Sequence, residues 1–270
     1  MNPRHAAALL SAIALTLAVS TPARAQTSES VSAETRSFLR FVEDASIVPA
    51  FWLEGQGRYL TNRSPFGDSE AEDSNVLYLG PVVAFNVAED FEFGARVGYA
   101  NRDRDEGGSQ SGLTDADLWG KVSIVSDPVS ISVGILLTMP TGDERKFLGT
   151  GETDVEFFSG IRKDLKRVTL SGHAGLRINQ DPDFEDVDVE GKNSWLLGGG
   201  LIISATQNLG LLLEWAYESE RLEGADKDSR IMGGFHYRIG ENFRFRAAAG
   251  FGISDGAPDT ELQAGAVLVF

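Results

Sequence analysis

Side chains that could carry out catalysis are few in this 270-residue sequence. The absence of cysteine excludes a thiolate nucleophile, a disulfide framework and a zinc–sulfur site. His173 and His236 belong to no His-Glu-x-x-His motif, and the sequence contains no Gly-x-Ser-x-Gly elbow, so the zinc-protease and α/β-hydrolase patterns are both missing. We therefore predict a protein that is not an enzyme and that holds no cofactor and no metal.

Basic residues gather beside a short turn at Gly240. Antiparallel pairing across this turn would set Arg238 opposite Arg244. The same register would set His236 opposite Arg246. We interpret these four side chains as a basic patch on one face of the chain, which favours anions in its neighbourhood. The alternative is that acids neutralise these charges and that the groups serve the structure alone.

A second group of charged residues on the same polar face is acidic. It consists of Asp115, Asp117, Asp154 and Glu156. Opposed to the basic patch, it would set up an electric field able to orient a polar solute.

A run of acids between residues 181 and 190 is a candidate for cation binding. Its members are Asp181, Asp183, Glu185, Asp186, Asp188 and Glu190. Carboxylates are the ligands that Ca²⁺ and Mg²⁺ prefer, but the glycine of an EF-hand loop is missing here. A solvated loop is the simpler interpretation.

These groups must be positioned by β-strands, because apolar and polar residues alternate from Ala50 onward. The predicted strands are 50–60, 74–87, 91–102, 113–125, 129–141, 151–163, 168–179, 194–205, 209–219, 228–239, 243–254 and 260–270. Tight turns alternate with longer loops rich in acid and glycine, such as 102–112. This is the pattern of a barrel that has short turns at one rim and long loops at the other.

The predicted fold class is all-β: a transmembrane antiparallel up-and-down β-barrel of 12 strands, with short periplasmic turns and longer extracellular loops. A soluble β-sandwich would also alternate, but its strands are typically about five or six residues long. A tilted strand needs about nine to eleven residues to cross a bilayer. Aromatic residues near both ends of the strands fit the two girdles at the membrane interfaces.

The chain before the barrel divides into two parts. Residues 1–25 match a signal peptide, with Arg4 at the start, an apolar stretch at 6–19 and Ala23-Arg24-Ala25 before the cleavage point. A membrane anchor is the alternative, but the apolar stretch is shorter than the roughly 20 residues that span a bilayer. The barrel itself is predicted to occupy 50–270.

Residues 26–49 lie between the signal peptide and the barrel. Phe38, Phe41, Val42 and Ala45 fall at helical spacing, and Pro49 ends the segment. We predict that this part enters the lumen as a plug or lies at the periplasmic rim. Disorder up to about Thr35 is the third alternative.

The stretch from Leu113 to Leu165 resembles the outer-membrane family named for the meta-pathway of phenol degradation. The resemblance rests on Asp115-Ala116-Asp117-Leu118-Trp119-Gly120-Lys121, on Pro140-Thr141-Gly142-Asp143 and on Gly149-Thr150-Gly151. It implies a passive transporter or channel in the cell outer membrane for small solutes, aromatic or hydrophobic compounds among them. It implies no ligand-binding residues.

Two other functions stay open at this point. A structural or adhesive outer-membrane protein would conduct no solute. A lipid hydrolase would resemble the twelve-stranded outer-membrane phospholipases, whose nucleophile and histidine face the lipid, whereas Ser171 and His173 here share the lumen face. Expected partners are outer-membrane lipid and lipopolysaccharide, the outer-membrane assembly machinery and a small-molecule solute. A net charge of −16 argues against nucleic acid.

The last strand carries the spacing of an outer-membrane assembly signal, formed by Gln263, Gly265, Leu268 and the final residue Phe270. Removal of Phe270 is expected to reduce the yield of membrane-inserted protein, because the insertion machinery recognises this terminus. Outer-membrane fractions of the truncated and complete chains can be compared directly. Insertion of the truncated chain at the yield of the complete chain would show that the terminus is not such a signal.

Overall fold

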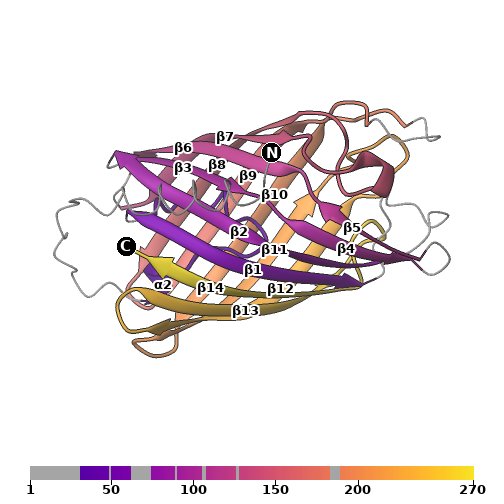
Figure 1. Ribbon diagram of the computed structural model, residues 1–270. Helices are drawn as coiled ribbons and strands as arrows, with labels where there is room; N and C mark the ends of the chain where they lie inside the picture. Colours follow the sequence, from indigo (N-terminus) through magenta and orange to yellow (C-terminus); the bar gives the residue numbers. More distant parts are fainter. Residues whose placement is uncertain are drawn as a thin grey trace, which may run out of the picture.

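The computed structural model describes residues 31–48, 50–61, 74–88, 90–104, 108–125, 128–182 and 189–270, so the predicted signal peptide lies outside the described residues. The strands form one sheet that closes on itself, as Figure 1 shows. Closure is made by β1 (Phe51–Thr61), which pairs with β2 (Ser74–Ala88) on one side and with β14 (Thr260–Val269) on the other. Both pairings are antiparallel. A closed barrel leaves no free sheet edge.

The other strands lie between these in chain order. They are β3 (Phe91–Arg96), β4 (Tyr99–Arg104), β5 (Gly108–Leu113), β6 (Ala116–Val125), β7 (Ser130–Met139), β8 (Asp154–Leu165), β9 (Val168–Ile178), β10 (Ser194–Ser204), β11 (Leu209–Glu218), β12 (Asp228–Ile239) and β13 (Phe243–Gly252). Within the described ranges, the helical elements are α2 (Val31–Glu34) and the 3-10 turn η1 (Glu144–Lys146). No helix of these ranges is long and apolar enough to cross a membrane.

The fourteen labelled strands make 12 crossings of the wall. The strands β3 and β4 are two parts of one crossing, because both pair with β2. The strands β5 and β6 are two parts of the next crossing, since β5 pairs with β4 and β6 with β3. The predicted 12-strand antiparallel barrel is therefore confirmed.

The wall is interrupted where these two crossings divide, at Val97–Gly98 and at 114–115. The neighbouring β2 carries Pro81 here, which lacks the backbone N–H of a regular ladder. At Gly80 a Cβ atom would lie only 2.1 Å from the carbonyl oxygen of Val97, so the backbones approach as closely as glycine alone permits. The strand predicted over 91–102 is consequently divided in two.

Residues 108–112 are a further difference, because the sequence predicts a loop there and the structure has β5, which ends at Leu113. The side chains of Ser109 and Ser111 bond those of Asn101 and Tyr99 across the β4–β5 pair, at 2.9 and 3.0 Å. Serine, glycine and glutamine give no apolar alternation, so the sequence pattern could not mark this strand. Beyond the apolar band, a barrel wall does not need apolar side chains.

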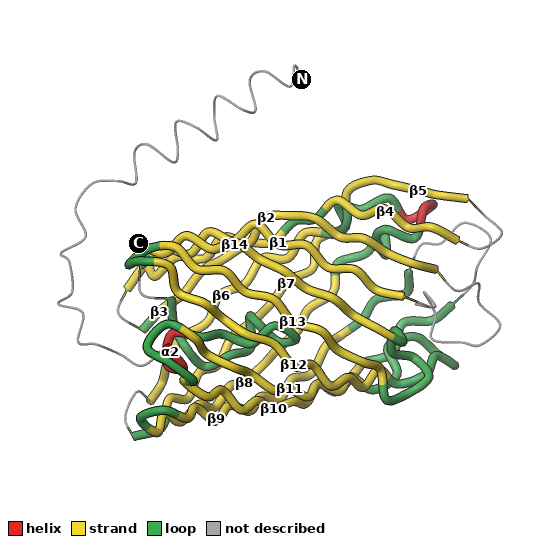
Figure 2. Tube along the Cα trace, turned by 90° about the horizontal axis from the view of Figure 1, so that it is seen from below, coloured by secondary structure: helices red, strands yellow, loops and turns green. Residues whose placement is uncertain are grey.

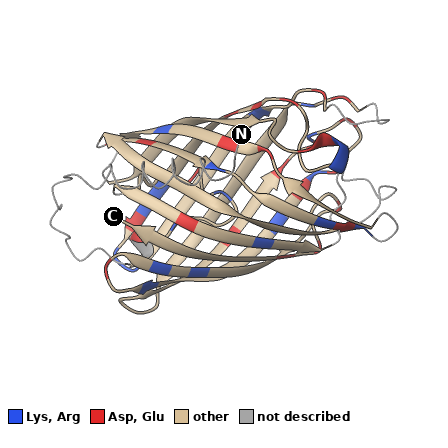
Figure 3. Ribbon diagram, in the orientation of Figure 1, with Lys and Arg blue, Asp and Glu red and all other residues tan. Residues whose placement is uncertain are grey.

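Side chains alternate between an outward face and the lumen. In β11, Leu211, Leu213 and Trp215 are exposed on the outward face. The residues between them, among them Glu214, are buried in the lumen. Figure 3 shows Lys, Arg, Asp and Glu as separate bands along strands that are otherwise uncharged. Charges belong inside because a Lys or Arg facing lipid at the bilayer midplane costs roughly 2–4 kcal/mol.

Two tryptophans depart from the outward girdles and face the lumen. Trp52 and Trp119 are both almost fully buried, at 2% and 1% exposure. The indole N–H of Trp119 donates to Glu92 at 3.0 Å. Its ring lies over Gly94, where a Cβ atom would be 2.1 Å from the ring. Gly94 therefore provides the space that this buried ring occupies.

We expect Gly94→Ala to lower the free energy of unfolding by about 1–3 kcal/mol, because the added methyl group must displace Trp119. Gly55→Ala is the matched control, since nothing lies within 4 Å of the Cβ position there. Urea unfolding, followed by the mobility difference between folded and unfolded barrels on gels, measures both. Equal stability of the two variants would contradict the packing of Trp119 against Gly94.

Candidate functional site

Residues 31–48, called the inner segment below, lie inside the barrel among lumen-facing side chains. The segment starts with α2 close to the rim formed by the short turns, called the short-turn rim, and then folds back through irregular turns (Figures 1 and 2). Its apolar residues bury against the wall. Phe41 and Val42 pack with Trp52 and Trp119 of the lumen face. The segment thereby joins a buried apolar cluster inside the barrel.

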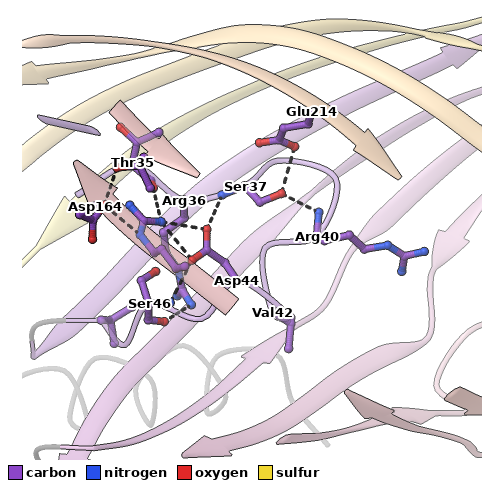
Figure 4. A network of polar contacts seen from close by, with 12 residues as sticks. Thr35, Arg36, Ser37, Arg40, Val42, Asp44, Ser46, Asp164 and Glu214 are labelled. Atoms are coloured by element: carbon purple, nitrogen blue, oxygen red, sulfur yellow. Dashed lines mark hydrogen bonds and ion pairs between the residues drawn. The ribbon is translucent and has the colours of Figure 1, made fainter. Parts of the chain in front are cut away.

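Asp44 is the central anchor of the inner segment. Its carboxylate accepts hydrogen bonds from Nη1 of Arg162, in β8, at 3.1 and 3.2 Å, and both side chains are buried. The same carboxylate accepts the backbone N–H groups of Ser37 and Ser46 at 3.1 and 2.9 Å (Figure 4). Lys121 donates to the carbonyl oxygen of Asp44 at 2.7 Å. Asp44 thus stabilises the turns of the segment and bonds it to two strands, β8 through its carboxylate and β6 through its backbone carbonyl.

Glu92, in β3, is a carboxylate of the wall that binds an arginine of the inner segment. Arg36 lies 3.3 Å from it, with both side chains buried. Glu92 also accepts the backbone N–H of Val48 at 2.9 Å. Both ends of the irregular part of the segment are therefore bonded to the wall.

Glu214 holds the turn in the middle of the segment. It accepts the backbone N–H groups of Phe38 and Leu39, each at 2.9 Å, and the hydroxyl of Ser37 at 3.0 Å. Figure 4 shows Glu214 above the turn. The helical spacing from Phe38 to Ala45 predicted a helix, but the structure has turns there. The backbone N–H groups of Phe38 and Leu39 are donated to Glu214, and a helix-type bond joins the N–H of Asp44 to the carbonyl oxygen of Arg40 at 3.2 Å.

The predicted basic patch lies around one carboxylate of the inner segment. Arg238 and Arg244 face each other across β12 and β13, as the register around Gly240 predicts. Arg238 bonds one oxygen of Glu34 at 2.7 Å, and Arg244 bonds the other oxygen at 2.9 Å. We call this arrangement the arginine clamp. No pattern in the sequence indicates that Glu34 binds between these two arginines.

The other two members of the patch lie one step further along the same strands. Arg246 donates to the carbonyl oxygen of Ser37 at 2.8 Å and stacks on the ring of Phe38 at 3.8 Å. Glu54 lies 3.6 Å from it. His236 is buried at 1% exposure, and neither ring nitrogen has a hydrogen-bond partner within the described residues. The structure brings Arg246 and His236 next to the clamp but not onto Glu34.

The four predicted lumen acids do not form a joint site. Asp117 bonds Arg96 at 3.0 Å, Glu156 bonds Arg177 at 3.1 Å and Asp154 bonds Arg221 at 2.6 Å. Asp115 has a different role, because it lies between strands and accepts the backbone N–H groups of Gly142 and Thr150, both at 2.9 Å. It fastens the loop at 140–150 against the wall, and β8 starts only at Asp154.

A cavity of about 400 Å³ lies between the inner segment and the long loops at the opposite rim. Phe38, Arg40 and Phe41 of the segment form its inner end. Its wall combines aromatic rings, such as those of Tyr78 and Phe147, with several arginines. A volume of this size falls in the range of small-molecule sites, about 300–1,000 Å³.

The acidic loop at the long-loop rim is described only in part. Residues 183–188 lie outside the described residues, and Asp181 accepts the backbone N–H of Gly191 at 2.8 Å. Nearby, the ammonium group of Lys192 bonds Glu220 and lowers the pKa of that exposed carboxyl. Within the described ranges no group of three or more His, Asp or Glu could hold a metal ion.

The predicted assembly signal occupies β14 and the residue after it. Gln263 and Gly265 face the lumen, whereas Leu268 and Phe270 are exposed on the outward face. Phe270 and Phe51 exchange two backbone hydrogen bonds of 3.0 Å, which complete the junction between the last and first strands. The last residue therefore also takes part in barrel closure.

No family model and no curated protein matches the sequence of the chain. Its fold, however, is similar to those of several solved structures. The COG4313 outer membrane channel from Pseudomonas putida F1 superposes with a TM-score of 0.64 at 14% identity, covering 85% of this chain and 98% of that one. The KdgM porin superposes with a TM-score of 0.53 at 10% identity, covering 81% of this chain and 99% of that one. The CymD monoaromatic hydrocarbon channel superposes with a TM-score of 0.50 at 9% identity, covering 84% of this chain and 90% of that one. At these identities the likeness shows the outer-membrane β-barrel fold.

We expect Asp44→Asn to loosen the inner segment, because Arg162 would lose the buried one of its two carboxylate partners and keep only Asp164, at 3.4 Å. Trypsin cleavage after Arg36 and Arg40, followed by mass spectrometry of the folded barrel, should accelerate severalfold. Glu220→Gln removes the same charge from an exposed loop and should leave cleavage unchanged. Equal resistance of the Asp44→Asn variant and the unmodified protein would refute the anchoring role.

Proposed function

We propose that the protein is a passive channel of the outer membrane for small solutes, and that the inner segment is its gate. The observation that carries the proposal is a closed barrel whose polar lumen holds a cavity of about 400 Å³ that ends at a non-wall segment. A segment held by side chains, rather than by a β-ladder, can shift without opening the barrel. The outer-membrane channels and porins that share the fold support this proposal.

The finer proposal is that the solutes include small aromatic or hydrophobic compounds. The cavity is lined by Phe38, Phe41, Tyr78 and Phe147, whose rings suit an apolar body. Arginines between these rings suit a polar substituent. The resemblance to the family named for phenol degradation and the fold shared with a monoaromatic hydrocarbon channel point the same way.

The proposal places the protein in the cell outer membrane and makes it no enzyme. Lipid and lipopolysaccharide would cover its apolar outward face, and the assembly machinery would meet the strand that ends at Phe270. Ser171 and His173 lie on the lumen side of β9, away from lipid, which disfavours the lipid-hydrolase alternative. A lipase measurement on refolded protein tests that alternative separately.

The gate can be tested with a reversible crosslink, since the chain has no cysteine of its own. A Cβ atom at Gly210 would lie 3.0 Å from Oγ1 of Thr35, close enough for a disulfide between Thr35→Cys and Gly210→Cys. We expect the oxidised double variant to lose conductance in planar bilayers and swelling of liposomes with small sugars, organic acids and phenols. Reduction should restore both.

Thr35→Cys alone is the control and should not respond to oxidant. Unchanged conductance after complete crosslinking would exclude the segment as the gate. Absence of conductance and of swelling in the unmodified protein, in the Asp44→Asn variant and in the reduced double variant would favour the structural alternative over a channel.

A further inference from the structure

The wall charges that contact the inner segment are unbalanced. The cations are Lys121, Arg162, Arg238, Arg244 and Arg246, and the carboxylates are Glu92, Glu214 and Glu218. The segment has three carboxylates and two arginines within residues 31–48. Three of these cations also have a wall carboxylate, since Lys121 lies 3.4 Å from Glu92, Arg162 3.4 Å from Asp164 and Arg246 3.6 Å from Glu54. Within the described residues, Arg238 and Arg244 are the two whose carboxylate comes only from the segment. Toward the long-loop rim the wall supplies its own partners, as in Arg58 with Glu261 at 2.7 Å.

The arginine clamp shows this imbalance most clearly. Arg238 and Arg244 lie directly opposite each other, a like-charge pair that is unfavourable by itself. Their only ion-pair partner among the described residues is Glu34, which comes from the segment and not from the wall. Their other hydrogen bonds go to the neutral carbonyl oxygens of Gln207 and Glu241. A carboxylate is thus required to hold these two guanidinium groups together.

The geometry of the clamp is that of anion recognition. Each oxygen of one carboxylate receives a charge-assisted bond from a different guanidinium group, at 2.7 and 2.9 Å. Arg246 lies deeper and is only 2% exposed; its Nε and Nη1 have no hydrogen bond to the described residues, although Nη1 lies 3.6 Å from Glu54. The clamp lies near the short-turn rim, where Glu34 and Arg238 remain 20% and 23% exposed. Solutes can therefore reach it from that rim.

We propose that Arg238 and Arg244 form a binding site for small carboxylates, which Glu34 occupies while the inner segment is seated. A solute carboxylate and Glu34 compete for the same two guanidinium groups. Withdrawal of Glu34 leaves the two arginines of the clamp as an unneutralised positive pair that faces the lumen. The binding site rests on the clamp alone, whereas its effect on ion selectivity rests on the channel function proposed above.

Replacement of Glu34 by alanine leaves a vacancy that a free carboxylate can fill. Thermal unfolding of Glu34→Ala in detergent should occur at a lower temperature than in the unmodified protein. Sodium acetate should raise that temperature saturably, and sodium chloride at equal ionic strength should not. The same measurement on Glu34→Ala with Arg238→Gln and Arg244→Gln should show no response to acetate.

Recovery with chloride equal to that with acetate, or recovery in the triple variant, would overturn the site. Recovery with inorganic phosphate that equals recovery with acetate would overturn the carboxylate class, because both oxyanions would then bind alike. If Glu34→Ala does not fold, Glu34→Gln keeps the size of the side chain, and its response to acetate is measured in the same way.

Selectivity is measured separately from binding, by reversal potentials of Glu34→Gln in planar bilayers under a potassium chloride gradient. The chloride-to-potassium permeability ratio should rise severalfold over that of the unmodified protein. Adding Arg238→Gln and Arg244→Gln should remove the increase. An unchanged ratio in a conducting Glu34→Gln variant overturns the selectivity claim. If acetate raises the unfolding temperature of Glu34→Ala but no variant conducts current, the proposal of a binding site stands and the proposal of a channel is wrong.

Discussion

Neutralisation of charge inside a closed barrel is the constraint on which this structure depends. The outward face must be apolar, so the charged residues of the strands are forced into the lumen, where few waters can solvate them. Near the long-loop rim the strands neutralise one another, as Glu156 does with Arg177. Near the short-turn rim the described wall supplies no carboxylate to Arg238 and Arg244, so the inner segment provides Glu34, and its Asp44 pairs with Arg162. The segment thus neutralises charges of the barrel wall but takes no part in the backbone hydrogen bonds between its strands.

With the proposed function, this division allows one chain to be both a stable barrel and a channel closed by its own inner segment. Strand pairing from β1 to β14 does not involve the segment, so its release leaves the ladder intact. Release does separate buried ion pairs and exposes Phe41 and Val42 to the lumen. Opening therefore requires something that compensates the charges, and a solute anion at the arginine clamp would supply part of that compensation.

Periodicity and turn residues were sufficient to predict the barrel, its 12 crossings and the register that sets Arg238 opposite Arg244. Local pattern could not show the division at Val97–Gly98, which depends on contact with Gly80 in a neighbouring strand. It also could not show the role of Asp115, because its partners at 142 and 150 come from another loop. The contacts of the inner segment were missed for the same reason. Its apolar spacing was visible, but the carboxylate of Glu214 that binds its N–H groups comes from far along the chain.

Hydrogen exchange of the inner segment, measured by mass spectrometry on the barrel in lipid nanodiscs, tests the central claim most directly. The amides of Phe38 and Leu39 are donated to a buried carboxylate, so the account predicts exchange far slower than in an unstructured chain. It predicts further that Glu214→Gln accelerates exchange in residues 31–48 and leaves that of the strands unchanged. Exchange of these amides at the rate of an unstructured peptide in the unmodified protein would contradict a segment seated in the lumen.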